Sequence, residues 1–277
     1  LGDLTTTAVE NDDGTYSLSG NKVFISGGDH DMTENIVHLV LARIEGAPQG
    51  SRGLSLFIAP KIHVDDNGNL LEPNDIVCTG IEEKMGLHGS PTCTMALGSK
   101  GNCRGVLVGE KNKGLPIMFL MMNKARLMTG AQGLACASSA YLYSLDYART
   151  RIQGVLPGDP EKKSVPLIEH PDIRRMLLTM KAYSEGMRSL LCFVGNLEDQ
   201  KNVAESVEEK QVCQNLIDIL IPLAKGYVTD RAIDVCNLGI QIFGGYGYTS
   251  EYPVEQLLRE DHRVVGVRTR NQLDQHT

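Results

Sequence analysis

The stretch that most constrains the fold spans residues 241–248 and reads Gln-Ile-Phe-Gly-Gly-Tyr-Gly-Tyr. Three glycines in four positions let the backbone turn sharply and approach another group closely. The preceding run, residues 212–238, has the pattern of a helix, and Pro253 suits the first turn of a following helix. We therefore predict an elbow between two helices, whose exposed backbone N–H groups can hold an anion. A plain helix cap and turn would use the same glycines without a ligand.

The first hundred residues have the pattern of an all-β domain. Short runs rich in Val, Ile, Thr, Leu and Phe alternate with turn pairs such as Asp13-Gly14 and Ser19-Gly20. Their spacing predicts a small antiparallel barrel or sandwich. The expected strands are residues 6–10, 15–19, 22–26, 36–44, 54–59, 81–85, 92–97 and 105–108.

The period changes from Gly114 onward, where the pattern becomes helical. A run from Pro116 to about Arg151 is apolar nearly all round, which predicts a helix buried in a bundle. Residues 152–169 are expected to form a loop, and Pro171 to open a second helix with an apolar residue every three or four positions. Ser206 followed by a glutamate three residues later predicts the capped start of a third helix, which Pro222 should kink. The fold class is therefore α+β.

Composition excludes several classes of function. The net charge is −7 with no basic stripe, which argues against nucleic-acid binding. No apolar run reaches membrane-spanning length. The 7 cysteines form no C-x-x-C pair and indicate reduced thiols of a cytoplasmic protein rather than a disulfide framework or a metal site. The histidines, among them His38, His88 and His170, lack ligand spacing and are interpreted as solvated polar residues. The chain begins with Leu1 rather than Met, which we interpret as a truncated N-terminus.

Three motifs together resemble a known family. The 241–248 elbow is similar to the C-terminal signature of the acyl-CoA dehydrogenases, which are FAD-dependent flavoenzymes. Residues 20–28, Gly-Asn-Lys-Val-Phe-Ile-Ser-Gly-Gly, and 84–92, Lys-Met-Gly-Leu-His-Gly-Ser-Pro-Thr, resemble two segments of that family's middle domain. The sequences of residues 121–127 and 170–177 are most similar to those of the family's branch that oxidises 3-methylthiopropanoyl-CoA. The resemblance implies a middle β domain at residues 1–112, an antiparallel four-helix-bundle-type domain at 113–262, an aberrant tail at 263–277 and a missing N-terminal helical domain.

The resemblance also implies a cofactor site for FAD. In the family, an aromatic and a hydroxyl residue on either side of an isoleucine contact the flavin, which assigns this role to Phe24, Ile25 and Ser26. A glutamine, two glycines and an arginine bind the FAD phosphates of the neighbouring subunit, which implies a homodimer or homotetramer. These positions correspond to Gln241, Gly244, Gly245 and Arg151. Without the motifs, Phe24 and Ser26 would be interpreted as a strand end, and Arg151 as a solvated helix-end cation.

The family's reaction removes an α-proton from an acyl-CoA thioester with a glutamate and passes the β-hydride to FAD; the electrons then go to electron-transferring flavoprotein. Asn123 and Arg126 match positions beside the substrate. The catalytic glutamate is absent: its expected position is near Thr269, and a minority position falls on Ala125. The chain as written is therefore expected to be inactive.

Three alternatives remain open. The tail from about Arg268 can be an out-of-frame reading, because restoring one base would give Tyr-Glu-Gly-Thr-Asn, the family's segment. The protein can be an oxidase relative that uses oxygen as its acceptor. It can also be a catalytically silent scaffold that binds flavin or acyl-CoA.

Overall fold

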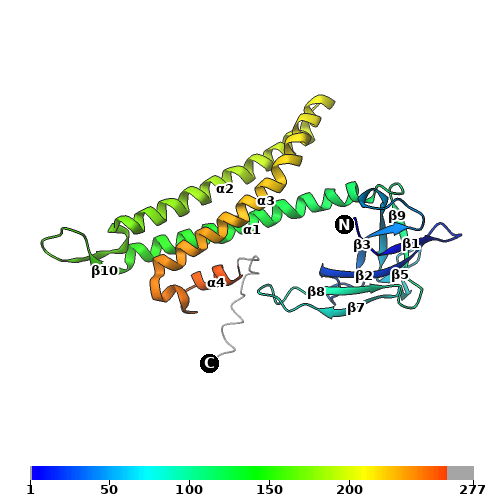
Figure 1. The fold of residues 1–277 in the computed structure, drawn as a ribbon, viewed down its shortest axis with the longest axis horizontal. Helices are drawn as coiled ribbons and strands as arrows, with labels where there is room; N and C mark the ends of the chain where they lie inside the picture. Colours follow the sequence, from blue (N-terminus) through cyan, green and yellow to red (C-terminus); the bar gives the residue numbers. More distant parts are fainter. Residues whose placement is uncertain (1, 261–277) are drawn as a thin grey trace. The chain divides into compact units, whose positions relative to one another are not determined.

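The computed structural model describes residues 2–260, so the predicted tail at 263–277 lies outside the described part of the chain. It forms two compact units. The first combines Leu1–Lys84 with His88–Met122, and the second joins Met85–Leu87 to the chain from Asn123 onward. The first unit contains the sheet and the second contains most of the helical residues (Figure 1).

The first unit is built on a seven-stranded sheet with the order β1-β3-β4-β9-β2-β8-β7 and an additional β1–β2 pairing. β1 thus lies between two strands, antiparallel to β2 and parallel to β3. The other pairings in this sheet are antiparallel. The strands are β1 Thr7–Glu10, β2 Tyr16–Ser26, β3 Val37–Ile44, β4 Leu54–Pro60, β7 Ile76–Ile81, β8 Thr92–Leu97 and β9 Arg104–Val108. A separate hairpin pairs β5 Ile62–Val64 with β6 Leu70–Pro73.

Alternation of side chains places one face of these strands in the core. Tyr16 and Leu18 of β2 are buried and their neighbour Ser17 is only half-buried, as the period of two requires. The Tyr16 ring lies 5.0 Å from that of Phe57, centroid to centroid. Phe57 itself is fully buried in β4. These contacts form the hydrophobic core of the sheet unit.

Three predictions about strands and the segments between them were wrong: one turn, one strand and one loop. Ser19-Gly20 is not a turn, because β2 runs unbroken through it. Gly20 is needed for a close approach instead: a Cβ there would lie 2.9 Å from the Cα of Thr6. The strand predicted at 81–85 ends rather than begins at Ile81. The predicted loop at 152–169 contains a short hairpin of β10 Ile152–Val155 and β11 Ser164–Pro166. The prolines and glycines of this segment argue against strands in the sequence, so the hairpin was not predicted.

The helices agree closely with the sequence pattern. They are α1 Gly114–Thr150, α2 Pro171–Val203, α3 Val207–Phe243 and α4 Val254–Glu260, with the short 3₁₀ helices η1 Ser51–Gly53, η2 Leu167–Glu169 and η3 Gly244–Tyr248. Pro171 occupies the first turn of α2, as predicted. The elbow between α3 and α4 is confirmed, with η3 forming its turn. Pro222 lies inside α3, which continues through it, and the kink stays a prediction. No helix in the described range 2–260 is long and apolar enough to cross a membrane.

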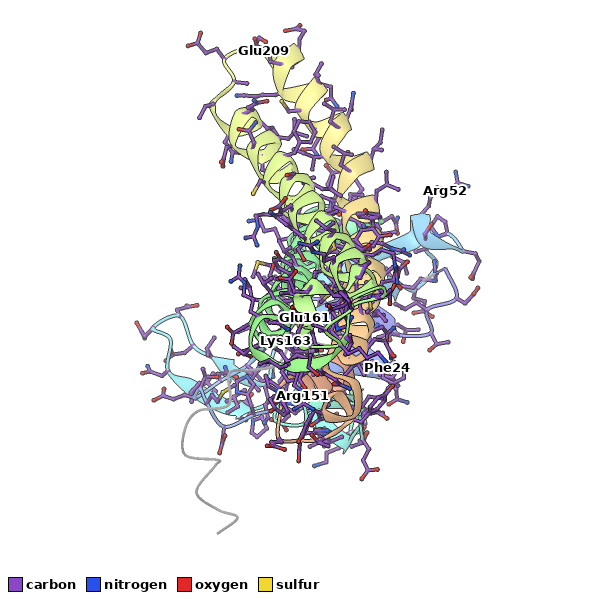
Figure 2. The ribbon with its side chains drawn as sticks, turned by 90° about the vertical axis from the view of Figure 1, so that its left-hand side faces the viewer. Phe24, Arg52, Arg151, Glu161, Lys163 and Glu209 are labelled. Carbon is purple, nitrogen blue, oxygen red and sulfur yellow. The ribbon has the colours of Figure 1, made fainter. Side chains whose placement is uncertain are left out.

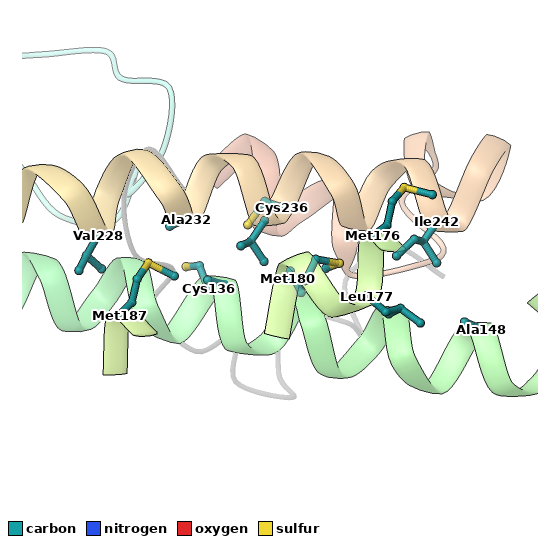
Figure 3. Packing of buried hydrophobic residues seen from close by; sticks show 13 residues of the cluster. Cys136, Ala148, Met176, Leu177, Met180, Met187, Val228, Ala232, Cys236 and Ile242 are labelled. Carbon is teal, nitrogen blue, oxygen red and sulfur yellow. The ribbon is translucent and has the colours of Figure 1, made fainter. Parts of the chain in front are cut away.

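The helical core is packed by methionines against small residues (Figure 3). Met180 and Met187 of α2 are fully buried, as are Val228 and Val235 of α3. α1 contributes cysteine and alanine side chains, such as the buried Ala137, to the same cluster. Small residues let the helix backbones approach, and flexible thioethers fill the remaining gaps. The methionine-rich stripes therefore fill the core of the helical unit.

The cap of α3 gives a direct stability test. The Ser206 hydroxyl accepts a hydrogen bond from the Glu209 backbone N–H at 3.1 Å. We expect Ser206→Ala to lower the free energy of unfolding by about 1 kcal/mol, because that N–H loses its acceptor. Urea denaturation followed by circular dichroism measures the change. Ser206→Asp keeps a capping oxygen and should retain near wild-type stability, so an equal loss in both variants would contradict the cap.

Candidate functional site: a cleft at the helical elbow

Four residues predicted to bind one ligand line a single cleft in the helical unit. They are Arg151, Gln241, Gly244 and Gly245. The cleft has a volume of about 660 Å³ and lies where the end of α1, the start of α2 and the α3 elbow meet. The residues come from positions up to 94 apart in the chain (245 − 151). Their convergence is a result of tertiary structure.

Arg151 is held in place by its own backbone. Its N–H donates to the Tyr147 carbonyl at 2.9 Å, and its carbonyl accepts from the Leu167 N–H at 2.8 Å. The side chain is exposed, and its guanidinium carbon lies 5.8 Å from the centroid of the Tyr246 ring (Figure 2 labels Arg151). A cation over an aromatic face is attracted to it. The guanidinium is therefore positioned beside the elbow with N–H groups available to a ligand.

The three glycines of the elbow differ in whether the backbone conformation or the packing at each position favours glycine. Gly244 has φ of +60°, a left-handed conformation that favours glycine, and caps α3 by donating its N–H to Gln241. Gly247 allows a close approach, because a Cβ there would lie 2.5 Å from the Ile240 carbonyl oxygen. Gly245 has neither constraint: its φ is ordinary and a Cβ would point into open space. Backbone conformation therefore favours glycine at 244 and packing requires it at 247, whereas neither constraint applies at 245.

An aromatic cluster that the sequence did not predict supports the elbow. The rings of Tyr147 and Phe243 stack with centroids 4.1 Å apart and an interplanar angle of 17°. Tyr252 meets both of them at 5.7 Å and 5.3 Å, and also lies 5.3 Å from Tyr246. Burial raises the pKa of the Tyr147 hydroxyl. Because these rings come from α1, α3 and the elbow, they fix the cleft walls against one another. The available signal in the sequence was the four-residue spacing of Tyr147 and Arg151, which places the two side chains near each other, one helical turn apart.

His170 is a second contributor that the sequence did not predict. It is half-buried and lines the cleft, and its Nε2 lies 2.8 Å from the Gln153 carbonyl oxygen. Gly154 beside it has φ of +78°, and a Cβ there would approach the imidazole to 3.2 Å. The prediction of a merely solvated side chain was wrong, because the β10–β11 hairpin folds against the start of α2.

The flavin-edge residues predicted in the sheet unit lie at a β-bulge. The register of β2 on β8 shifts between Lys22 and Ile25, and Phe24 within the bulge has φ of +58°. Its side chain is 70% exposed (Figure 2 labels Phe24). Ser26 is also exposed and pairs with Thr92. A left-handed aromatic residue costs of order 1 kcal/mol or more, and such strain concentrates at functional sites. The bulge thus presents a large apolar ring to its surroundings.

The two predicted substrate residues contact each other on α1. The Arg126 guanidinium donates to the Asn123 side-chain oxygen at 3.2 Å, as residues three apart on a helix can. Ala125, the alternative position of the catalytic base, is exposed between them. The expected position near Thr269 lies outside the described residues. The structure therefore places the substrate pair on one stretch of helix.

A separate cavity of about 550 Å³ lies in the sheet unit and was not predicted. Its lining is mainly apolar, but includes Lys22 and His38. The Lys22 ammonium donates to the Leu41 carbonyl oxygen at 2.6 Å, and burial lowers its pKa to about 8. The His38 Nε2 is buried without a hydrogen-bond partner, which corrects the prediction that this side chain is solvated. The pKa of His38 is also lowered, and burial is the largest cause.

Lys22 should make stability depend on pH. Its folded pKa of about 8 lies below its ordinary value of 10.5, so between these values the unfolded chain binds more protons than the folded chain. The free energy of unfolding therefore rises with pH across this window. We expect Lys22→Met to stabilise the protein by about 1–2 kcal/mol at pH 7, a discounted figure because the side chain keeps some solvent contact and the variant loses the Leu41 bond.

The gain from Lys22→Met should shrink as the pH rises from 8 towards 10.5, where wild-type Lys22 is neutral. Urea denaturation at several pH values measures this difference. Lys100→Met, at an exposed position, is the matched control and should show no such pH dependence. A constant difference between Lys22→Met and wild type at all pH values would contradict the expectation.

Comparison with known proteins identifies the family. The family profile "Acyl-CoA dehydrogenase, C-terminal domain" matches residues 112–265. The chain is 46% identical over 261 residues to 3-methylmercaptopropionyl-CoA dehydrogenase of Ruegeria pomeroyi, covering 94% of this chain and 44% of that protein. It therefore spans less than half the length of this relative.

Comparison with solved structures leads to the same family. Caenorhabditis elegans ACDH-11, determined in complex with C11-CoA, superposes with a TM-score of 0.76 at 27% identity, covering 94% of this chain and 40% of that one. An acyl-CoA dehydrogenase of Bacillus anthracis complexed with FAD superposes with a TM-score of 0.71 at 26% identity, with the same coverage of 94% and 40%. The resemblance carried by the three motifs is confirmed, and this chain belongs to the acyl-CoA dehydrogenase family.

Proposed function

We propose that the chain is part of a flavoprotein acyl-CoA dehydrogenase that desaturates an acyl-CoA thioester between its α and β carbons. The observation that carries this proposal is the convergence of Arg151, Gln241, Gly244 and Gly245 on one cleft. The family membership and the less-than-half coverage of a longer relative support the view that this chain supplies the middle and C-terminal domains of a longer polypeptide.

The residues of the cleft fit the pyrophosphate of FAD. A guanidinium fork suits phosphate oxygens, and Arg151 presents one beside the elbow. The open space at Gly245 lets a phosphate approach the backbone, and the exposed Gln241 amide can donate to it. The relative from Bacillus anthracis was solved with FAD. We assign Arg151, Gln241, Gly244 and Gly245 to the phosphates, and Phe24, Ile25 and Ser26 to the flavin ring.

When bound, the flavin supplies the hydride acceptor for the reaction. The residues of this chain position the substrate: we assign Asn123 and Arg126 to the neighbourhood of the acyl thioester. Stabilising the charge that develops on the thioester carbonyl requires fixed hydrogen-bond donors, a role that the Arg126 guanidinium suits. The α-proton needs a carboxylate base, and neither Ala125 nor Thr269 supplies one. We propose that restoring the reading frame in the tail restores this glutamate.

The substrate is a CoA thioester in this proposal. The relative from Ruegeria pomeroyi is named for 3-methylmercaptopropionyl-CoA, and a second relative, at 41% identity, for butyryl-CoA. Both names describe short acyl chains, so we propose a short acyl group here and electron-transferring flavoprotein as the acceptor.

We further propose a homodimer or homotetramer, because the family resemblance assigns Arg151 and Gln241 to a neighbouring subunit's cofactor. Large apolar side chains stay exposed on the long helices, including Leu178 at 67%, Ile219 at 61% and Leu223 at 59%. A second copy of the chain could bury such side chains and remove them from water. A strictly monomeric protein that retains flavin in sedimentation would contradict this part of the proposal.

Anaerobic addition of butyryl-CoA to the FAD-loaded protein tests the function. The chain as written should retain its flavin colour, because it lacks the base. A frame-restored version ending in Tyr-Glu-Gly-Thr-Asn should bleach, at a rate higher by roughly 10²–10⁴-fold, the usual contribution of a positioned base. Bleaching of neither version would favour the scaffold alternative, and hydrogen peroxide production in air would favour the oxidase alternative.

A further inference from the structure

Two cysteines and a methionine share one face of the neighbouring strands β7 and β8 (Figure 1). Cys78 of β7 lies directly opposite Met95 of β8. Directly opposite residues of an antiparallel pair share a face, with Cβ atoms about 4.5–5.5 Å apart. Cys93 comes two residues before Met95 in β8, so it points to the same face. All three side chains pack in the hydrophobic cluster of the sheet unit.

The two thiols lie within hydrogen-bonding reach of each other. The Cys78 thiol donates to the Gly80 carbonyl oxygen at 3.3 Å, beside the register shift between these two residues. The pKa of the Cys93 thiol is raised, first by burial and then by a hydrogen bond with the Cys78 side chain. The hydrogen bonds therefore link Cys93, Cys78 and Gly80 in a chain.

The Met95 thioether reaches the same group beside Gly28. A Cβ built at Gly28 would lie 3.0 Å from the Cβ of Cys93 and 3.0 Å from the Sδ of Met95. The two side chains therefore meet against the backbone of Gly28. A larger residue at this buried position would have to displace one of them.

The surroundings of the three sulfur atoms suit a bound cation. Backbone hydrogen bonds from Asp29 and Gly28 act on the Cys93 sulfur and lower its pKa, against the effect of burial. The same donors would stabilise the negative charge of a metal-bound thiolate, as outer partners of metal ligands do. Cys93 is fully buried, whereas Cys78 is half-buried and gives access from solvent.

The kind of cation follows from the ligand atoms. Thiolate and thioether sulfur are soft ligands, which select Cu(I) over hard cations such as Mg²⁺. A structural Zn²⁺ site needs four cysteine or histidine ligands in most cases. Within residues 2–260, no third His, Cys, Asp or Glu side chain joins these two cysteines to hold a metal. Two thiols and one thioether therefore favour Cu(I) over Zn²⁺.

We propose that Cys78, Cys93 and Met95 form a binding site for one Cu(I) ion. Binding forms two copper–thiolate bonds and one copper–thioether bond, releases the two thiol protons to solvent, and changes no oxidation state. The site goes beyond the proposed flavin chemistry and does not depend on it. The cysteines are 15 residues apart in the chain (93 − 78), so the pairing of β7 with β8 brings them together and no short motif marks them.

Anaerobic competition with the chelator bathocuproine disulfonate tests the site. The chelator forms a coloured Cu(I) complex, so uptake of Cu(I) by the full chain without flavin is measured as loss of colour. Cys78→Ser should weaken Cu(I) binding by at least about 100-fold, the upper end of the loss caused by removing only a supporting contact. Cys213→Ser is the matched control, because Cys213 is also half-buried but lies in α3. This variant should bind Cu(I) as wild type does.

X-ray absorption at the copper edge, with one equivalent of Cu(I), counts the ligands. Wild type should show three sulfur neighbours, and the volume-conserving Met95→Leu should show two and bind about tenfold more weakly. Circular dichroism checks that each variant is folded. Equal Cu(I) affinity of Cys78→Ser and wild type would overturn the site, as would displacement of Cu(I) by an equimolar amount of Zn²⁺. An unchanged number of sulfur neighbours in Met95→Leu would overturn the three-ligand arrangement.

Discussion

Replacing Arg151 with alanine should weaken FAD binding about 10- to 100-fold, the loss expected when a charge-assisted hydrogen-bond donor to phosphate is removed. The guanidinium lies beside Tyr246 at the cleft wall, and its backbone is fixed by bonds to Tyr147 and Leu167. The side chain is exposed, so its removal should leave the fold intact. Titration of the apoprotein with FAD, followed by flavin fluorescence, gives the dissociation constant.

Arg149 offers a matched control for this experiment. It is an exposed arginine in the last turn of α1, two residues before Arg151, but does not line the cleft. Arg149→Ala should therefore bind FAD as wild type does. Arg151→Lys keeps the charge without the planar fork and should fall between wild type and alanine. Equal affinities of Arg151→Ala and Arg149→Ala would remove Arg151 from the proposed cofactor site.

Gly247→Ala should destabilise the helical unit by about 1–3 kcal/mol, because overpacking against backbone is not relieved by rotating a side chain. The new Cβ would lie 2.5 Å from the Ile240 carbonyl oxygen and 3.0 Å from its Cα. The elbow must then move away from the end of α3, which carries Gln241. We expect FAD affinity to fall together with stability. Urea denaturation and FAD titration of one preparation measure both.

Gly245→Ala separates the ligand from the fold at the same elbow. A Cβ at this position meets no atom within 4 Å and the backbone is not left-handed, so stability should change by less than about 0.5 kcal/mol. The methyl group would nevertheless project where a phosphate is expected, and FAD affinity should decrease. Wild-type affinity in Gly245→Ala would contradict the close approach proposed there. Wild-type stability in Gly247→Ala would contradict the packing of the elbow.

Local patterns predicted the helical half well. The boundaries of α2 and α3 follow from Pro171 and the Ser206 cap, because these residues act within one turn of the helix end. The elbow is predictable for the same reason, since Gly244 must adopt a left-handed conformation to end α3. The sheet was less predictable: Gly20 has the local pattern of a turn residue, yet its role is to let Thr6 approach from a segment that packs against β2.

Some features of the candidate site were also predictable from the sequence, and others were not. The motifs in the sequence predicted Arg151, Gln241, Gly244 and Gly245 as ligand contacts, but could not show that these residues share one cleft. The roles of His170 and the Tyr147–Phe243 stack were not predicted, because each depends on a partner from another element. Phe24 was predicted as a flavin contact, but its left-handed backbone, at a bulge between β2 and β8, was not predicted.

The sequence by itself determined the family, the helix ends and the identity of the elbow glycines, because each is encoded by residues close together in the chain. Only the tertiary structure decided which side chains share the cleft and that β2 passes straight through Gly20. Those features depend on pairings between distant segments, where register and packing outweigh local preference.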